Sequence, residues 1–372
     1  MLKKFLITAC LFAFFLLNIF NTLYSQSSID NSRRNAITNA VAKASPAIVG
    51  INITEVVRTQ SSLSRFFGND PLFDLFRGQM GGYEREVQGL GSGFIISKDG
   101  YIVTNHHVAG NASKIIVTMT DGQKYDAKII GSDETSDITL LKIDTDKDLP
   151  HLKFCKSEEV IAGEWAIAFG NPFGLFDLNA KPTVTVGVVS NSGVDFVQDK
   201  RVYKGMIQTD AAISSGNSGG PLINALGEVI GMNTVIFSTA QTGSGAGSIG
   251  IGWAIPSNRL ATIVDRLKKH KQINRNYFLG MDLQLLDSRT AKYYKINAEY
   301  GLFVTRTYNN SAATLAGIEP GDLIIEINGK KVRKADDFYL SVFDGEVGQK
   351  FEFVILRANE KIHTTYTLRE RN

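Results

Sequence analysis

Short apolar runs separated by turn residues restrict the fold of this chain more than any other feature of its sequence. Asp99-Gly100 and Asp121-Gly122 have the composition of tight hairpin turns. The runs that we predict as strands are 46–51, 94–97, 101–104, 114–119, 125–132 and 138–143, followed by 165–169, 183–191, 205–209, 221–223, 229–235 and 251–255. Short strands at this spacing are typical of sandwiches and barrels. The chain is therefore expected to be mainly β, with a second barrel that begins near Trp165.

The length of the chain predicts more than one folded unit. Its 372 residues exceed the usual size of a single domain, and 43% hydrophobic with 21% charged residues is ordinary for a globular protein. The net charge is +3, and it falls to +1 without Lys3 and Lys4, since 38 basic and 37 acidic residues then remain. This balance gives no indication of a nucleic-acid partner.

A glycine-dense turn between residues 209 and 222 contains the candidate nucleophile, Ser218. Glycines on both sides allow the backbone to turn tightly and bring successive N–H groups to one point, as an oxyanion hole requires. We assign this hole to Gly216, Asn217 and Ser218, with the N–H groups of Gly216 and Ser218 as donors. A serine hydroxyl is inert at neutral pH without a base, so the assignment needs a histidine and an acid elsewhere in the chain.

Two upstream motifs supply a base and an acid. Residues 104–108, Thr-Asn-His-His-Val, follow a strand-like run, and Asp137 stands at the head of another apolar run. The chain order is histidine, aspartate, serine, which is that of the two-barrel serine proteases and differs from the order in the subtilisin and α/β-hydrolase folds. The histidine and the aspartate fall on the first barrel and Ser218 on the second, so the reaction is expected in the cleft between them.

Each motif has a structural alternative when it stands alone. A Gly-Asn-Ser-Gly-Gly segment is most often a turn, and an aspartate before an apolar strand is most often a solvated strand end. Their joint occurrence in protease order favours the enzyme. His106 and His107 compete for the role of base, and strand periodicity turns adjacent residues to opposite faces, so only one of the two is expected to reach the cleft.

Five motifs resemble those of the HtrA (Deg) serine proteases, and the resemblance extends from about Val41 to the C-terminus. The motifs are residues 91–94, 104–108, 137–138, 216–220 and 251–256. The resemblance implies a chymotrypsin-like double β-barrel in which His107 is the base, because the family pattern is Thr-Asn-x-His-Val, and Asp137 orients it. It implies neither a metal nor a cofactor. One wall of the specificity pocket would be formed by Ile249, Gly250, Ile251, Gly252 and Trp253.

An amphipathic helix is expected to close the protease unit. Its apolar residues follow i, i+3, i+4, i+7 spacing, with Ser257 as its N-cap and a basic end. These apolar residues are Leu260, Ile263, Val264 and Leu267. A polar linker over residues 272–276 follows the helix.

The residues after the linker resemble a single PDZ domain, a small α+β module that binds a peptide C-terminus by strand addition. Asn328-Gly329 is a strong hairpin turn within it. The resemblance implies a carboxylate-binding loop made by Phe278, Leu279, Gly280 and Met281, and a side-chain groove between a strand over 281–285 and a helix over 335–343. We therefore divide the chain into an N-terminal segment 1–25, a protease domain 26–271 and a PDZ domain 276–372.

The first 25 residues have the pattern of a targeting segment. Lys3 and Lys4 precede a nearly uninterrupted apolar stretch from Phe5 to Phe20, which predicts export. Cleavage as a signal peptide and retention of residues 5–24 as an inner-membrane anchor both remain open, because the stretch is long for the first and short for the second. Cys10 imitates a lipoprotein site but lies too close to the N-terminus, and Cys155 then has no disulfide partner, so we expect a buried thiol there.

A phenylalanine-rich segment lies between residues 54 and 88, where strand periodicity is weak. Residues 66–76 carry several phenylalanines, which a disordered linker would lack. In the HtrA family a long loop at this place reaches towards another subunit's active site. A loop packed on its own barrel is the alternative, and the sequence does not decide between them.

The resemblance implies an exported serine endopeptidase of the periplasm or cell envelope. It would degrade unfolded or damaged envelope proteins, cleave after small aliphatic residues, bind peptide C-termini at the PDZ domain, and assemble as a trimer or a multiple of trimers. Two alternatives stay open: a membrane-anchored regulatory protease that cuts one stress-signalling substrate, and a weakly proteolytic chaperone or PDZ scaffold.

One position departs from the family pattern. Family members that couple PDZ occupancy to the active site often carry an arginine in the loop after the strand near residues 183–190, where this chain has Val194. Arg201 lies nearby but out of register. Whether the PDZ domain activates the protease or only tethers substrates is therefore left open.

Overall fold

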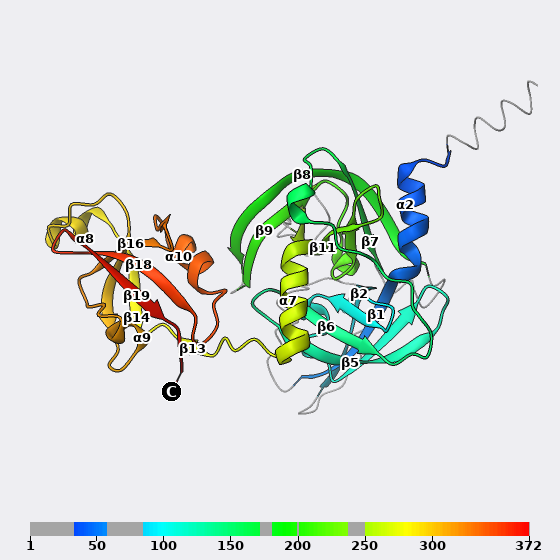
Figure 1. Cartoon of the computed structure of the whole chain (residues 1–372), viewed down its shortest axis with the longest axis horizontal. Coiled ribbons are helices and arrows are strands. Elements are labelled where there is room, and N and C mark those ends of the chain that lie inside the picture. The colour runs from blue at the N-terminus through cyan, green and yellow to red at the C-terminus, as the bar shows by residue number, and fades with distance from the viewer. Residues whose placement is uncertain (1–32, 58–84, 172–180, 199–200, 237–249, 372) are drawn as a thin grey trace, which may run out of the picture.

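The computed structural model of the chain describes residues 33–57, 85–171, 181–198, 201–236 and 250–371. Two closed antiparallel barrels are followed by a smaller domain built on a mixed arrangement of strands and short helices (Figure 1). The mainly β prediction and the predicted double barrel are therefore confirmed. The N-terminal segment 1–25 and the phenylalanines of residues 66–76 lie outside the described residues.

The first barrel closes in the order β1-β2-β3-β6-β5-β4. Its strands are β1 (Ile48–Val57), β2 (Arg85–Ile95), β3 (Tyr101–Thr104), β4 (Lys114–Met119), β5 (Lys124–Asp133) and β6 (Ile138–Ile143). The inward side chains are fully buried, among them Ile51, Phe94 and Leu140. Because the barrel has no free edge, its interior forms one continuous apolar core that fixes the loops at its rim.

The second barrel closes in the order β10-β11-β12-β9-β8-β7. Its strands are β7 (Trp165–Gly170), β8 (Thr183–Gln198), β9 (Arg201–Thr209), β10 (Pro221–Ile223), β11 (Val229–Ile236) and β12 (Gly252–Pro256). The small residues Ala166, Ala168 and Ala254 fill part of its interior and allow close packing. This barrel carries the glycine-dense turn between β9 and β10.

Two strands are longer than the sequence predicted. We predicted strands only over 183–191 and 205–209, whereas residues 192–198 and 201–204 extend β8 and β9 into a long hairpin with register shifts near Asn191 and Val194. The hairpin is stabilised by Phe196, whose ring lies 5.0 Å from that of Tyr203 and 5.2 Å from that of Trp253. Bulges interrupt the apolar alternation in this stretch, so the sequence pattern hides the strand.

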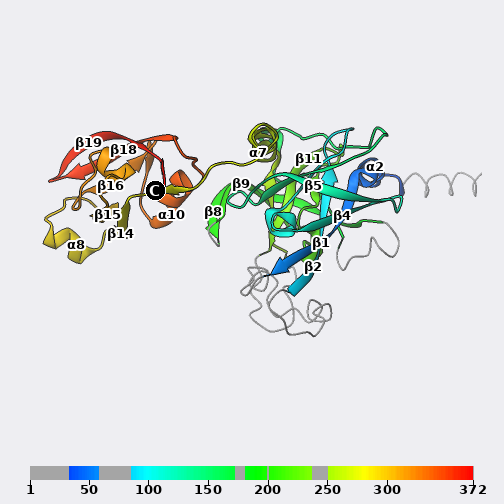
Figure 2. The ribbon, with the colours of Figure 1, turned by 90° about the horizontal axis from the view of Figure 1, so that it is seen from below.

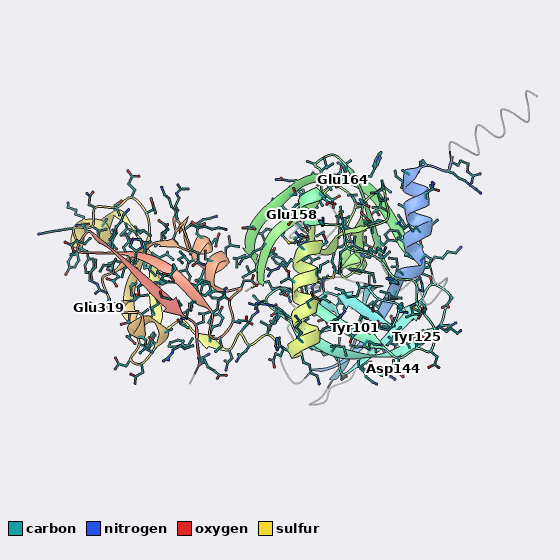
Figure 3. The ribbon with its side chains drawn as sticks, viewed as in Figure 1. Tyr101, Tyr125, Asp144, Glu158, Glu164 and Glu319 are labelled. Carbon is teal, nitrogen blue, oxygen red and sulfur yellow. The ribbon has the colours of Figure 1, made fainter. Side chains whose placement is uncertain are left out.

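Helix α7 (Ser257–His270) spans both barrels (Figure 1). All four apolar residues predicted for its inner face are buried, so that prediction is confirmed. Ser257 does not cap the helix: Pro256 is the N-cap, and the Ser257 hydroxyl donates to the carbonyl of Cys155 at 2.5 Å. Near its end Lys268 lies over the ring of Tyr101, labelled in Figure 3, at 4.3 Å.

The other helices that the structure describes in the double-barrel unit are short. They are α2 (Ala36–Ala44), η1 (Ser45–Ala47), α5 (His106–Ala109), η2 (Ser157–Glu159) and η4 (Ser215–Asn217). Asn35 caps α2 by accepting from the N–H of Thr38. Over the described part of the chain, no helix combines the length and apolar character needed to cross a bilayer.

The C-terminal domain is a sheet in the order β14-β15-β16-β18-β19, with β17 paired to β16 and a separate β13-β20 pair. Its strands are β13 (Tyr277–Phe278), β14 (Met281–Leu285), β15 (Leu302–Thr307), β16 (Leu323–Ile327), β17 (Lys330–Lys331), β18 (Lys350–Arg357), β19 (Glu360–Thr367) and β20 (Arg369–Glu370). Its helices are α8 (Ser288–Tyr293), α9 (Ala312–Leu315) and α10 (Ala335–Val342). Phe353 and Tyr366 stack in its core at 4.8 Å.

The two units meet along one narrow face. The smaller domain lies on the side of β8 and β9 (Figure 2), and helix α10 contacts both strands. In the turn after α10, Asp344 and Glu346 accept hydrogen bonds from Arg259 and Arg266 of α7. The linker between α7 and β13 runs past this contact. The orientation of the smaller domain is thus fixed by side chains of α7, of the linker and of the turn after α10.

Candidate active site

His107 and Asp137 form a direct pair at the rim of the first barrel. Nδ1 of His107 lies 2.8 Å from Oδ2 and 3.0 Å from Oδ1 of Asp137, and the backbone N–H of His107 donates to Oδ1 at 3.0 Å. Because the carboxylate accepts from both the ring and its backbone, the imidazole is held in one orientation. Because Nδ1 is used by the aspartate, Nε2 is the ring nitrogen available to act as the base.

Asp137 adopts a strained backbone conformation. Its φ is 59°, in the left-handed region that residues other than glycine rarely occupy. The N–H of Asp137 donates to the carbonyl of Glu134 at 3.2 Å, and the carbonyl of Asp137 accepts from Nδ2 of Asn105 at 3.0 Å. The turn between β5 and β6 therefore directs the carboxylate inward, towards the histidine.

The Asp137 carboxylate is fully buried. Burial by itself raises its pKa, but the charge and hydrogen bond of His107, together with Arg201 and Thr234, hold the pKa below its usual range. Nε of Arg201 is 3.8 Å from Oδ1, and the hydroxyl of Thr234 donates to Oδ2 at 2.7 Å. The group is thus an anion at neutral pH.

Ser218 joins the same cluster from the second barrel. Its hydroxyl donates to the carbonyl of Thr234 at 3.3 Å, and its side chain is buried. Since the side chain of Thr234 also holds Asp137, this residue of β11 links the candidate nucleophile to the candidate acid. The structure brings His107 and Asp137 into contact and connects Ser218 to Asp137 through Thr234.

The turn that carries Ser218 requires glycine at position 219. Gly219 has a φ of 83°, and a Cβ built on it would lie 2.2 Å from the carbonyl oxygen of Ser92. The N–H of Ser92 donates to the carbonyl of Ser218 at 3.1 Å, so β2 of the first barrel lies directly against the turn. This close approach joins the two barrels at the candidate nucleophile.

Both polar groups of the peptide between Gly216 and Asn217 have hydrogen-bond partners within the protein. Its carbonyl accepts from the hydroxyl of Ser92 at 2.7 Å and from the N–H of Asn171 at 3.1 Å, and its N–H donates to the carbonyl of Ser214 at 2.9 Å. The N–H of Asn217 is therefore already engaged within η4. The assignment of the hole to Gly216, Asn217 and Ser218 stays a prediction, with the N–H groups of Gly216 and Ser218 as its donors.

His106 has a partner of its own. Its Nδ1 lies 2.8 Å from the hydroxyl of Ser132, and burial lowers its pKa. A Cβ on Gly110 would lie 2.1 Å from that Nδ1, so the ring fills the space that the glycine leaves. Both histidines lie on α5 rather than on a strand, so the strand-periodicity argument for choosing between them was wrong.

The residues predicted to form one wall of the specificity pocket do not all lie on the same side of β12. A Cβ on Gly252 would lie 2.5 Å from Cγ1 of Ile213, so the strand lies against the segment that precedes the nucleophile turn. The indole of Trp253 instead packs on Phe196 in the barrel core, as strand alternation requires. Ile249 lies outside the described residues.

The predicted carboxylate loop of the smaller domain lies at the start of edge strand β14. Gly280 has a φ of 75°, and a Cβ on it would lie 2.3 Å from Cβ of Ser311. Its carbonyl accepts from the N–H of Tyr308 at 2.9 Å, and the carbonyl of Leu279 accepts from the hydroxyl of Tyr366 at 2.7 Å. The loop is therefore anchored through its carbonyls beside an unpaired strand edge, as strand addition requires.

Sequence reasoning missed two residues that contact Asp137. Thr234 lies within a run that we predicted only as a barrel strand, and Arg201 was noted only for its register. Neither residue type signals a role by itself, because the contact depends on how β9 and β11 close the second barrel.

Family models match both parts of the chain. The model described as trypsin-like peptidase domain matches residues 91–232, and that described as PDZ domain matches residues 267–338. A solved structure described as HtrA-type protease AlgW with decapeptide superposes with a TM-score of 0.69 at 33% identity, over 91% of this chain and 99% of that one.

Curated relatives extend over most of the chain. A protein of Chlamydia trachomatis named as a probable periplasmic serine endoprotease DegP-like is 40% identical over 368 residues, which cover 92% of this chain and 70% of that protein. Periplasmic serine endoprotease DegP of Escherichia coli is 37% identical over 348 residues, covering 88% of this chain and 71% of that one. The chain therefore belongs to the HtrA (DegP) family of serine endoproteases, with a trypsin-like peptidase domain and one PDZ domain.

Proposed function

We propose that this protease cleaves peptide bonds through an acyl-enzyme formed on Ser218. His107 takes the proton of the serine hydroxyl through Nε2 and returns it to the leaving amine, while Asp137 holds the ring and stabilises the imidazolium. The N–H groups of Gly216 and Ser218 bind the oxyanion. The observation that carries the proposal is the Nδ1 to Oδ2 contact of 2.8 Å between His107 and the buried Asp137.

The proposed substrates are unfolded or damaged proteins of the cell envelope, cleaved after small aliphatic residues. The close approach of Gly252 to Ile213 supports a pocket that is apolar and restricted in size. Relatives named as periplasmic serine endoproteases support export to the periplasm, for which residues 1–25 would be the targeting segment or anchor. The solved relative with a decapeptide supports peptide binding, and we propose a trimer as the basic assembly.

Domain boundaries follow from the same reading. We propose a protease domain over residues 26–271 and a PDZ domain over 276–372, whose groove lies between β14 and α10. Val194 pairs with Met206 within the β8-β9 hairpin rather than lying in a loop. A valine at this position carries no charge and cannot form an ion pair when a peptide binds. We therefore propose weak coupling between the PDZ groove and the active site.

Digestion of casein by the purified protein tests the proposed activity. Ser218→Ala is expected to abolish digestion while leaving the circular-dichroism spectrum unchanged, and the exposed Ser192→Ala serves as the matched control. Digestion by Ser218→Ala at the wild-type rate would refute the nucleophile. A folded wild-type protein that leaves casein intact would instead favour a regulatory protease or a scaffold.

A further inference from the structure

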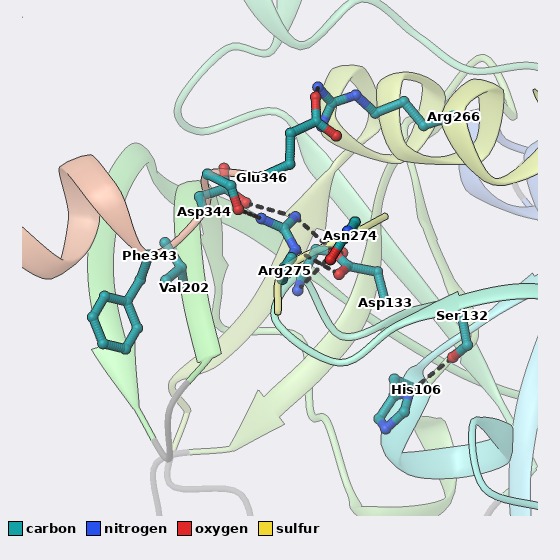
Figure 4. A network of polar contacts seen from close by, with 12 residues as sticks. His106, Ser132, Asp133, Val202, Arg266, Asn274, Arg275, Phe343, Asp344 and Glu346 are labelled. Atoms are coloured by element: carbon teal, nitrogen blue, oxygen red, sulfur yellow. Dashed lines mark hydrogen bonds and ion pairs between the residues drawn. The ribbon is translucent and has the colours of Figure 1, made fainter. Parts of the chain in front are cut away.

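The linker between the two domains carries an arginine that reaches a carboxylate of the first barrel. Nε of Arg275 donates to Oδ1 of Asp133 at 2.7 Å, and its Nη2 donates to Oδ2 at 2.9 Å (Figure 4). Both side chains are nearly buried, with 10% and 3% of their surface exposed. A two-point contact of this kind fixes the angle as well as the distance between the groups.

Asp133 in turn holds the turn that contains Asp137. Its Oδ2 accepts from the N–H of Ser136 at 3.2 Å and from the hydroxyl of Ser136 at 2.5 Å. Asp133 is also the β5 partner of Ile138, so it closes the hairpin on both sides of the turn. The next residue after Ser136 is Asp137, in its left-handed conformation.

The other side of the arginine faces the smaller domain. Nη2 of Arg275 donates to Oδ1 of Asp344 at 3.1 Å, and Nη1 donates to the carbonyl of Gly345 at 3.0 Å. Asp344 also accepts two hydrogen bonds of 2.9 Å from Arg259 on α7. Figure 4 shows the guanidinium of Arg275 between Asp133 and Asp344.

From this continuous set of contacts we infer that Arg275 is a positioning residue for the catalytic aspartate. It neutralises Asp133, and Asp133 then constrains Ser136 and with it the strained Asp137. Without the arginine, Asp133 would be a buried carboxylate with no cation bound to it. Its hydration would then be favoured over its hydrogen bonds to Ser136, and the turn would be less constrained. The inference rests on the proposed role of Asp137.

The competing explanation is that Arg275 only holds the smaller domain in place, because it also binds Asp344 and the carbonyl of Gly345. Arg266 provides the matched control. It lies on α7 and donates to Glu346 at 2.9 Å, across the same domain contact, and it makes no hydrogen bond or ion pair with Asp133. Loss of domain seating alone would therefore give the same result for both arginines.

Steady-state cleavage of a short peptide by the full-length chain tests the inference. For Arg275→Gln we expect kcat to fall by about tenfold or more with KM little changed, because small displacements of reacting groups cost large factors in rate. The acid limb of the pH profile of kcat is expected to move to lower pH, since a displaced Asp137 stabilises the imidazolium less. The kcat of Arg275→Lys should lie between those of the wild type and Arg275→Gln, because lysine keeps the charge but loses the two-point contact.

Arg266→Gln should keep the wild-type kcat and pH profile. Asp133→Asn should reproduce the kinetic defect of Arg275→Gln and provides the test if the latter fails to fold.

A wild-type kcat and pH profile for Arg275→Gln, or for Asp133→Asn where Arg275→Gln does not fold, would overturn the inference, as would an equal defect in Arg266→Gln. These outcomes are distinct from failure of the proposed mechanism, which would appear as retained cleavage by Ser218→Ala.

Discussion

The hydroxyl of Thr234, on the second barrel, donates a hydrogen bond of 2.7 Å to the carboxylate of Asp137, on the first. Both groups are buried, so the bond is shielded from water. The same residue accepts from Ser218 through its carbonyl. One threonine therefore contacts both the candidate acid and the candidate nucleophile, which lie on different barrels.

Thr234→Val is expected to lower kcat and to destabilise the fold by about 1–3 kcal/mol, because it removes one of the two donors to Oδ2 of a buried carboxylate. Thr234→Ser retains a hydroxyl and should keep most of the activity. Peptide kinetics and urea unfolding of the two variants measure both effects. Equal kinetics for valine and serine would show that the hydroxyl has no catalytic consequence.

Gly219→Ala should unfold or inactivate the protein, because a Cβ there would lie 2.2 Å from the carbonyl oxygen of Ser92. The control is Gly122→Ala, which has the same φ of 83° but no atom within 4 Å of the added Cβ. The control should cost only the backbone strain, about 1–2 kcal/mol. Thermal unfolding compares the two, and similar losses would mean that close packing against Ser92 is not required.

The contribution of Asp344 to stability should depend on pH in a defined direction. Burial raises its pKa, but Arg259, Lys204 and Arg275 outweigh burial and hold the pKa below its usual range. The folded state therefore binds fewer protons than the unfolded state, so the stabilisation is present above the ordinary aspartate pKa of about 3.9 and is lost as pH falls below it.

Urea unfolding of the wild type and of Asp344→Asn from pH 3 to pH 7 measures this contribution. The difference in unfolding free energy should be constant at neutral pH and should shrink on acidification below about pH 4. A difference that grows towards low pH would contradict the assigned sign. Asp282→Asn, at an exposed ion pair with Arg306, is the control and should show little effect at any pH.

Peptides with a free apolar C-terminus should bind the PDZ domain, and their amides should bind much more weakly, because the amide removes the charged acceptor. Gly280→Val should abolish binding of both, since a Cβ there meets Ser311 and the φ is positive. Fluorescence titration measures each affinity. Equal affinity for acid and amide would place the binding site away from the Gly280 loop.

The sequence predicted most of the strands because alternation and turn residues are local properties. It failed in the β8-β9 hairpin, where bulges at Asn191 and Val194 break the alternation. It also assigned Ser257 as a cap, because a serine before an apolar helix has that pattern, whereas its hydroxyl is used by Cys155. Contacts between segments distant in the chain decided both cases.

Motif order brought His107, Asp137 and Ser218 to attention, because the chemistry needs those residue types. The choice of Thr234 and Arg275 had no comparable signal. Thr234 contacts Asp137 from an ordinary strand, and Arg275 contacts Asp133 from a linker. Both contacts exist only after the chain has folded. Such residues are determined by tertiary packing.

Covalent labelling with a fluorophosphonate, located by peptide mass spectrometry, tests most directly whether Ser218 is a nucleophile activated by His107. We predict a single adduct on Ser218 in the wild type and strong loss of labelling in His107→Ala. Labelling should be retained in His106→Ala, because the His106 ring is hydrogen-bonded to Ser132. Labelling at another serine, or undiminished labelling of Ser218 in His107→Ala, would contradict the proposed mechanism.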